Sequence, residues 1–396
     1  NTSVAKSTIG VLGQMSIPSQ PVFSYEEYER RWNKVRSSMA ESNIDALITF
    51  NVENIFYLTG MDSENFFDYQ CVILPIADGE PKLVILDFES ARAENSSITK
   101  DIYTYGAFDD HLKFTLQVTT GLSDIKRIAI DRTVKESILN PLCVGLESKQ
   151  LSDAFGLVES ARLVKSKGEI EYMEKAAQLT DCGVRAGYEA IQAGVEDREV
   201  AAAIIEAMYR AGSDTVCWGP VVAAGYRAGT AHSTFNGHII QSNETVFMEL
   251  TGESSRYVSP LMRTAVAGEA LDNHRKVEQC VQAALAGIIS TASAGTPACE
   301  VAAKGLEALQ DVLPDHIFHH NFGYPVGIGY PGTWIEQLNF LIRADNDRPL
   351  LDGMVFHLPI SIRKYGEYGV NLSHTMVVES GGGRILGNSV AQLESV

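Results

Sequence analysis

The acidic residue that stands out in this chain is Glu249, which follows the apolar, strand-like run Val246, Phe247 and Met248. A carboxylate inside such a run is costly to bury unless it is paired or used. Eight of the nine histidines lie in the second half of the chain, on both sides of Glu249 in sequence. Carboxylate and imidazole groups exchange protons near neutral pH. We therefore expect Glu249 to mark an active site built by this half.

Two kinds of organisation surround this stretch. Strands alternate with helices up to about residue 155, which predicts an α/β domain. Beyond it the pattern predicts two helices, a sheet, two helices and a second sheet. The segment SARLVK is expected to be a short strand and link before the first of these helices. We expect two domains, residues 1–160 and 161–396.

Composition limits the possible partners. Lys and Arg number 32 against 50 Asp and Glu, and a net charge of −18 argues against binding to nucleic acid or a membrane surface. The six cysteines form no C-x-x-C pair, which argues against a zinc ribbon or a redox motif. Free thiols, and the absence of a visible secretory signal or spanning segment, predict a cytoplasmic protein.

Motifs in several parts of the chain resemble one family. RRWNKVRSSMAESNIDALITFNVENIFYLTG and ARLVKSKGEIEYMEKAAQLTD are similar to the amino-terminal domain and the link of creatinases and Xaa-Pro dipeptidases. AHSTFNG, ELTGESSRYVSPLMRT, FGYPVGIGYPGTW, GMVFHLPI and VNLSHTMVVE follow in the family's order. The chain is therefore identified as a member of the pita-bread family of creatinase, prolidase and methionine aminopeptidase. This resemblance implies a creatinase-type α/β domain followed by an α+β pita-bread catalytic domain.

Most members of that family hold two metal ions with two Asp, one His and two Glu. In this sequence the five positions fall at Glu249, Pro260, Tyr324, Pro359 and Ser373. Proline has no side-chain ligand, and hard divalent ions need several carboxylate or imidazole groups. The resemblance therefore implies an enzyme without a metal ion or another cofactor.

The members that work without metals include creatinase and ectoine hydrolase, and a histone-chaperone domain of this fold binds peptides. Met262 stands where creatinase has a Glu that holds the guanidinium group, so creatine is an unexpected substrate. The form EL-x-G-x(3)-RY-x(2)-PL-x-RT resembles the ectoine hydrolase branch. The resemblance implies hydrolysis of a non-peptide C–N bond in a small zwitterion, with an ectoine-type cyclic amidine first. The alternatives are a creatinase-like amidinohydrolase, an osmolyte lyase or a catalytically inactive binding module.

Two residues are the candidate catalytic groups. His232 matches the family's active-site histidine, and the resemblance implies that it acts as general acid and base. Glu249 is expected either to attack the amidine carbon or to orient water and hold the cationic amidinium. The alternative is a structural carboxylate paired with Arg256 or Arg263.

Further residues are candidates for substrate binding, each with core packing as the alternative. Tyr57 and Phe66 would close the pocket of a partner subunit, because creatinase-like proteins are dimers, and we expect a homodimer. Arg227 and Arg343 are candidates for a substrate carboxylate. Besides Arg343, the binding candidates are Tyr57, Phe66, Arg227, Tyr257, Tyr324, Trp334, Glu336, His357 and His374.

Overall fold

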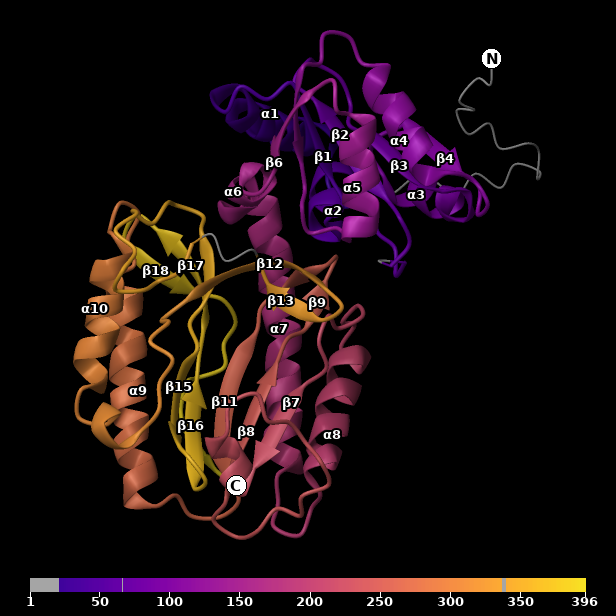
Figure 1. Ribbon diagram of the computed structural model, residues 1–396. Helices are drawn as coiled ribbons and strands as arrows, with labels where there is room; N and C mark the ends of the chain where they lie inside the picture. Colours follow the sequence, from indigo (N-terminus) through magenta and orange to yellow (C-terminus); the bar gives the residue numbers. More distant parts are fainter. Residues whose placement is uncertain (1–20, 66, 337–339) are drawn as a thin grey trace. The chain divides into compact units, whose positions relative to one another are not determined.

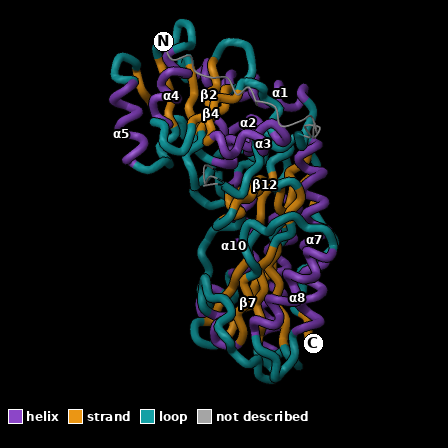
Figure 2. Tube along the Cα trace, turned by 90° about the vertical axis from the view of Figure 1, so that its right-hand side faces the viewer, coloured by secondary structure: helices purple, strands orange, loops and turns teal. Residues whose placement is uncertain are grey.

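The computed structural model describes residues 21–65, 67–336 and 340–396. The chain divides into two compact units, Asn1–Arg162 and Leu163–Val396 (Figures 1 and 2). Among the described residues, no helix is long and apolar enough to cross a membrane.

The amino-terminal unit is built on one six-stranded sheet in the order β4-β3-β2-β1-β5-β6. Its central strand β1 pairs antiparallel with β2 and parallel with β5. The strands are β1 (Ala46–Thr49), β2 (Cys71–Pro75), β3 (Lys82–Leu86), β4 (Ile102–Tyr105), β5 (Arg127–Ile130) and β6 (Gln150–Asp153). The helices are α1 (Tyr25–Glu41), α2 (Val52–Thr59), η1 (Asp87–Glu89), α3 (Ser90–Ser96), α4 (His111–Thr120), α5 (Glu136–Gly145) and α6 (Leu157–Leu163).

Helix α1 begins at a serine cap. The Ser24 side chain accepts a hydrogen bond from the Glu27 backbone N–H at 3.4 Å, which satisfies one free donor of the first turn. Two buried side chains of α1 then donate to backbone carbonyls near the end of α2. Arg31 Nη1 donates to the Tyr57 carbonyl at 3.1 Å, and Trp32 Nε1 donates to the Leu58 carbonyl at 2.6 Å. These bonds tie the two helices together.

One local prediction is wrong. The segment SARLVK is helical through Leu163, within α6, and is no strand. The long helix α7 that follows begins with a capping box, because Ser166 and Glu169 exchange side-chain and backbone hydrogen bonds at 3.3 Å and 2.8 Å.

The carboxy-terminal unit contains two helix pairs and several sheets. Its helices are α7 (Lys167–Ala190), α8 (Asp197–Arg210), η2 (Gly225–Gly229), α9 (Asp272–Thr291), α10 (Ala298–Leu309) and η3 (Leu313–Asp315). One sheet has the order β19-β11-β8-β7, a second has the order β18-β17-β14-β12-β10-β9 with β13 on β12, and β15 pairs with β16. Its first strands are β7 (Val221–Ala224), β8 (Thr245–Leu250), β9 (Glu253–Ser254), β10 (Tyr257–Val258) and β11 (Leu261–Val266). The others are β12 (Tyr324–Tyr330), β13 (Thr333–Ile335), β14 (Val355–His357), β15 (Ile360–Lys364), β16 (Tyr368–Leu372), β17 (Thr375–Glu379), β18 (Gly382–Ile385) and β19 (Glu394–Ser395).

Alternation along β8 separates the core from the site. Val246, Met248 and Leu250 are fully buried in a cluster with residues of α7 and α8. Gly187 lets α7 approach, because a Cβ there would lie 2.4 Å from the Met248 sulfur. Successive side chains of a strand point to opposite faces, so Glu249 faces away from this helix pair.

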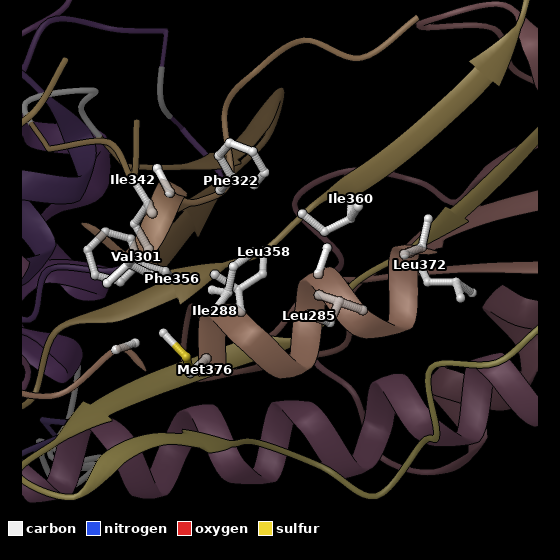
Figure 3. Close-up of a cluster of buried hydrophobic side chains, with 14 of the residues drawn as sticks. Leu285, Ile288, Val301, Phe322, Ile342, Phe356, Leu358, Ile360, Leu372 and Met376 are labelled. Atoms are coloured by element: carbon white, nitrogen blue, oxygen red, sulfur yellow. The ribbon is translucent and has the colours of Figure 1, made fainter. Parts of the chain in front are cut away.

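The second helix pair covers the other side of this unit. Buried side chains from α9 and α10 pack against strands β14 to β17, as Figure 3 shows for Leu285, Ile288, Phe356 and Met376. Figure 1 shows α9 and α10 beside β15 and β16, and α7 and α8 beside β7 and β8. The strands that carry the candidate site residues therefore lie between two packed helix pairs.

Candidate active site

Glu249 occupies the face of β8 that is turned away from α7 and α8. Its cross-strand neighbours are Val221 on β7 and Met262 on β11. The carboxylate is partly exposed, and among the described residues it makes no hydrogen bond or ion pair. Burial raises the pKa of Glu249 to about 7, and the positive charge of Arg363 opposes that rise. A carboxylate with such a pKa can exchange protons near neutral pH. The alternative of a structural pair with Arg256 or Arg263 is not what the structure contains.

Arg363 on β15 is the cation that influences Glu249, and sequence reasoning did not select it. It is 9% exposed, and its guanidinium carbon lies 5.3 Å from the centre of the Phe247 ring. Phe247 and Glu249 share one face of β8 because they are two residues apart. The signal available in the sequence is the alternation of Ser361 and Arg363 with Ile360 and Ile362.

Three residues form a buried hydrogen-bonded chain: Tyr324 on β12, His357 on β14, and Ser373 in the link between β16 and β17. His357 Nδ1 lies 2.7 Å from Tyr324 Oη, and His357 Nε2 lies 2.7 Å from Ser373 Oγ. Trp334 Nε1 donates to Tyr324 Oη at 3.0 Å, and the Met262 backbone N–H donates to Ser373 Oγ at 2.6 Å. Two of the predicted family ligand positions, Tyr324 and Ser373, are thus joined through one imidazole.

The direction of this chain follows from its donors. Burial lowers the pKa of His357 to about 3, so the ring is neutral at pH 7 and carries one N–H. If Nδ1 carries the hydrogen, Ser373 donates to Nε2 and the hydroxyl hydrogen of Tyr324 remains available. The reverse arrangement leaves a hydrogen on Ser373 without an acceptor, and Ser373 is fully buried, whereas Tyr324 is 8% exposed. An unsatisfied buried donor costs about 1–3 kcal/mol, so the first arrangement is favoured.

Tyr324 therefore presents an O–H group. Its pKa is raised well above its usual value by burial and by the nearby charge of Glu249, so it stays protonated. A neutral hydroxyl beside a carboxylate can donate a hydrogen bond to a bound polar molecule.

The predicted catalytic histidine lies in an exposed loop. The backbone of His232 has φ 56°, an uncommon left-handed conformation for a residue other than glycine. Among the described residues, no hydrogen bond joins His232 to Glu249. Burial lowers the pKa of His319 to about 4, and the charges of Arg363 and, less strongly, of His232 act in the same direction. His232 is therefore near His319. His319 is a second neighbour of the site that the sequence candidates did not include.

Four of the predicted binding residues differ from one another in the groups that they contact. Tyr257 on β10 donates to Glu169 Oε1 at 3.0 Å, and its ring stacks on that of Tyr172 of α7. Glu336 forms a buried ion pair with Lys165 at 2.6 Å. Trp334 supports Tyr324, as described above. His374 is 8% exposed, and its Nδ1 atom has no hydrogen-bond partner among the described residues.

His374 also lines a groove that no sequence feature predicted. The groove has a volume of about 470 Å³ and is bordered mostly by α9, β18 and residues 390–391. Burial and the charge of Arg263 lower the pKa of His374 to about 3, so its ring is neutral at pH 7.

The remaining binding candidates contribute little to this site. Tyr57 is fully buried in the amino-terminal unit, where its hydroxyl donates to the Ala161 carbonyl at 3.4 Å and Arg31 covers its ring. This packing matches the core alternative. Phe66 lies outside the described residues. Arg227 donates to the Thr234 carbonyl at 2.6 Å within its own loop, and Arg343 forms a surface pair with its neighbour Asp345.

Comparison with known proteins shows which family the chain belongs to. The profile of Metallopeptidase family M24 matches residues 171–380, and that of the Creatinase/Prolidase N-terminal domain matches residues 31–164. The chain belongs to the M24 family. The predicted creatinase-type and pita-bread architecture is confirmed, since M24 family structures share the fold.

Individual M24 relatives span almost the whole chain. An ectoine hydrolase from Halomonas elongata is 25% identical over 96% of this chain and 99% of its own length. A Xaa-Pro dipeptidase from Pyrococcus horikoshii is 23% identical over 91% of this chain and 97% of its own. The structure of a Xaa-Pro dipeptidase from Bacillus anthracis covers 93% of this chain and 100% of its own with a TM-score of 0.83 at 19% identity. The M24 comparisons support a hydrolase and leave its substrate open between these classes.

The M24 name implies metal ions, and the donor set of this chain does not fit them. Among the described residues, no group of three or more His, Cys, Asp or Glu side chains is placed to hold an ion. Tyr324 and Ser373 are both bonded to His357, and the two prolines offer no side-chain donor. Glu249 is the carboxylate among the five M24 ligand positions, and one carboxylate does not hold two divalent ions.

Proposed function

We propose that the chain is a metal-independent hydrolase that opens a C–N bond in a small zwitterion, with an ectoine-type cyclic amidine as substrate. One observation carries the proposal. Glu249 keeps a carboxylate that has no hydrogen-bond or ion-pair partner among the described residues, while Tyr324 and Ser373 are joined through His357. A carboxylate without a partner in such surroundings suits a cationic planar ligand such as an amidinium.

The reaction needs a nucleophile at the amidinium carbon. In one version Glu249 takes a proton from water as the water oxygen bonds to that carbon, which gives a neutral tetrahedral species. The ring C–N bond then breaks with its electron pair on nitrogen, and the nitrogen receives a proton. In the other version a Glu249 oxygen bonds to the carbon, and the ring C–N bond breaks with its electron pair on the nitrogen, which takes a proton. Water then bonds to the carbon of the resulting ester-like intermediate, and the bond to the Glu249 oxygen breaks, which frees the carboxylate.

Two neighbours would support either version. The Tyr324 hydroxyl, held by Trp334 and His357, donates a hydrogen bond to the substrate as charge develops. His232, in its exposed loop, donates a proton to the departing nitrogen, and exchange with solvent then restores the protonation states of His232 and Glu249. These roles are part of the proposal.

The test measures turnover of ectoine by the full chain after dialysis against EDTA, with the products followed by proton NMR. Ring opening in EDTA, lost in Glu249→Gln, is the expected result. Glu171→Gln is the matched control, because Glu171 is an exposed residue of α7 in the same unit. A circular dichroism spectrum confirms that each variant is folded.

The same samples are offered a Xaa-Pro dipeptide with Mn²⁺ present. Hydrolysis of the dipeptide that disappears in EDTA would overturn the proposal in favour of a peptidase. Stabilisation of the chain by ectoine without any turnover would instead indicate a binding module.

A further inference from the structure

A second buried polar chain runs along the β15–β16 hairpin, apart from the Tyr324 chain. Ser361 pairs with Asn371 across the hairpin, and Arg363 lies two residues along on the same face. Arg363 Nε donates to Ser361 Oγ at 2.7 Å, and Ser361 Oγ donates to Asn371 Oδ1 at 2.6 Å. All three side chains are at least nine-tenths buried.

Both ends of this chain carry donors. A guanidinium can only donate, so Ser361 accepts from Arg363 and passes its own hydrogen to the oxygen of Asn371. This direction fixes the orientation of the Asn371 side-chain amide, so its Nδ2 group remains as a donor. Arg363 Nη1 and Asn371 Nδ2 are buried, and neither has a hydrogen-bond partner among the described residues. A buried donor without an acceptor destabilises the folded chain.

Two other buried arginines, Arg263 and Arg31, differ from Arg363 in their partners. Arg263 is fully buried and donates to the carbonyls of Met262, Ser373 and Ser389 at 2.6–2.7 Å. Arg31 pairs with a carboxylate at 3.0 Å. Arg363 forms no ion pair among the residues that the structure describes. The charge of Glu249 reaches Arg363, but in the described part of the chain the two groups form no ion pair, so the guanidinium can bind an anion from outside the chain.

The hairpin is fixed against the sheet that carries Glu249. Thr264 Oγ1 on β11 accepts from the Asn371 backbone N–H at 2.9 Å and donates to the Asn371 carbonyl at 3.1 Å. Thr264 pairs with Phe247, whose ring Arg363 covers. The donors on the hairpin and the carboxylate on β8 therefore belong to one rigid arrangement.

We propose that Arg363 and Asn371 form a subsite for the carboxylate of the substrate, with Glu249 receiving its cationic group. This rests on the proposed function for the role of Glu249. A carboxylate offers four lone-pair sites, so it can accept from both the guanidinium and the amide. The substrate class is then a compact molecule with a carboxylate and a planar cation. A neutral or purely cationic amidine fits less well.

The experiment measures binding by isothermal titration calorimetry on the full chain, so it does not depend on turnover. The probes are ectoine, the methylated tetrahydropyrimidine ring of ectoine without its carboxylate, L-proline and acetate. The wild-type chain is expected to prefer ectoine to the ring without a carboxylate. Arg363→Gln should weaken ectoine binding about 10- to 100-fold and leave binding of the ring without a carboxylate unchanged.

Two further variants make the result specific. Asn371→Asp keeps an acceptor for Ser361 but replaces the amide donor with a negative charge, so it should also weaken every carboxylate probe. If the Arg363→Gln variant does not fold, the Asn371→Asp variant tests the carboxylate subsite in its place. Arg384→Gln removes the same charge from an exposed residue of β18 that pairs with Glu379, and it should change nothing.

Three outcomes would overturn the subsite. They are no binding of any carboxylate probe to the wild-type chain, equal affinity for ectoine and the ring without its carboxylate, and equal loss of both in a folded Arg363→Gln variant. Failure of the proposed function gives a different pattern, since ectoine would then bind in an Arg363-dependent way without being opened.

Discussion

Replacing Glu249 with Gln should stabilise the protein at alkaline pH even though it removes the proposed catalytic group. The carboxyl group has a pKa near 7 in the folded chain against an ordinary value of 4.5. A raised carboxyl pKa means that the folded state binds more protons than the unfolded state between these values. Stability is therefore lost as pH rises from about 4.5 to 7, and the loss is constant above 7.

The magnitude follows from the free energy of one pKa unit, which is about 1.4 kcal/mol. Ionisation of Glu249 costs the folded state about 1.4 kcal/mol at pH 5.5 and about 3.4 kcal/mol at pH 8.5. Partial exposure to water makes both values upper bounds. Glutamine has nearly the same shape and no charge, so the stability gained by Glu249→Gln should grow by up to about 2 kcal/mol across this range.

The assay is thermal unfolding followed by circular dichroism at pH 5.5, 7.0 and 8.5. For a unit of this size, about 2 kcal/mol corresponds to a Tm change of roughly 4–8 °C. Glu171→Gln, an exposed residue on α7, controls for the loss of one negative charge. The reasoning is refuted if the Tm difference between Glu249→Gln and wild type is the same at all three pH values, or shrinks as pH rises.

Three other predictions test the surroundings of Glu249. Tyr324→Phe should lower the free energy of unfolding by about 2–4 kcal/mol, measured in urea, because two buried N–H donors lose their acceptor. If ionised Glu249 carries the reaction, kcat/KM in a pH-rate profile should fall about tenfold per unit below pH 7, and a profile flat to pH 5 would contradict this. Gly369→Ala should destabilise the protein by about 1–3 kcal/mol, because its Cβ would lie 2.2 Å from the Ala228 carbonyl oxygen. A Gly366→Ala variant in the turn of the same hairpin, where a Cβ meets no neighbour but φ is 74°, compares backbone strain with that collision in the same urea assay.

Local sequence signals predicted the parts of the fold that local interactions decide. Ser24 caps α1, and apolar periodicity continues through α7 to Ala190, so both helices were predictable. SARLVK was assigned wrongly because a short apolar run with one β-branched residue fits either a strand or a helix. The outcome depended on the packing of the chain around it, which a single sequence does not contain.

The site divides in the same way. Glu249 could be selected as a candidate from the sequence because a lone acid in an apolar strand is unusual whatever the fold. The hydrogen-bonded link from Tyr324 through His357 to Ser373 was not predictable, since it joins two strands and a loop that are far apart in the sequence. Arg363 was missed for a related reason. Its importance lies in the acidic partner that it lacks, and the sequence shows acids nearby, such as Glu367, without showing that they pair elsewhere.

Most of the family's metal-ligand positions hold other residues in this chain, and this difference fits the chemistry of the proposed substrate. A peptide carbonyl is neutral and a poor electrophile, so metal ions that polarise it and supply hydroxide contribute much to its hydrolysis. An amidinium carbon already carries positive charge, so it needs less activation, which one carboxylate and one hydroxyl donor can supply. In the proposed reaction Glu249 and the O–H group of Tyr324 would provide these two functions, while Pro260 and Pro359 offer no side-chain ligand. Restoring metal binding would thus require new carboxylates at both prolines, and a Pro260→Asp exchange alone should not confer Mn²⁺-dependent dipeptide hydrolysis.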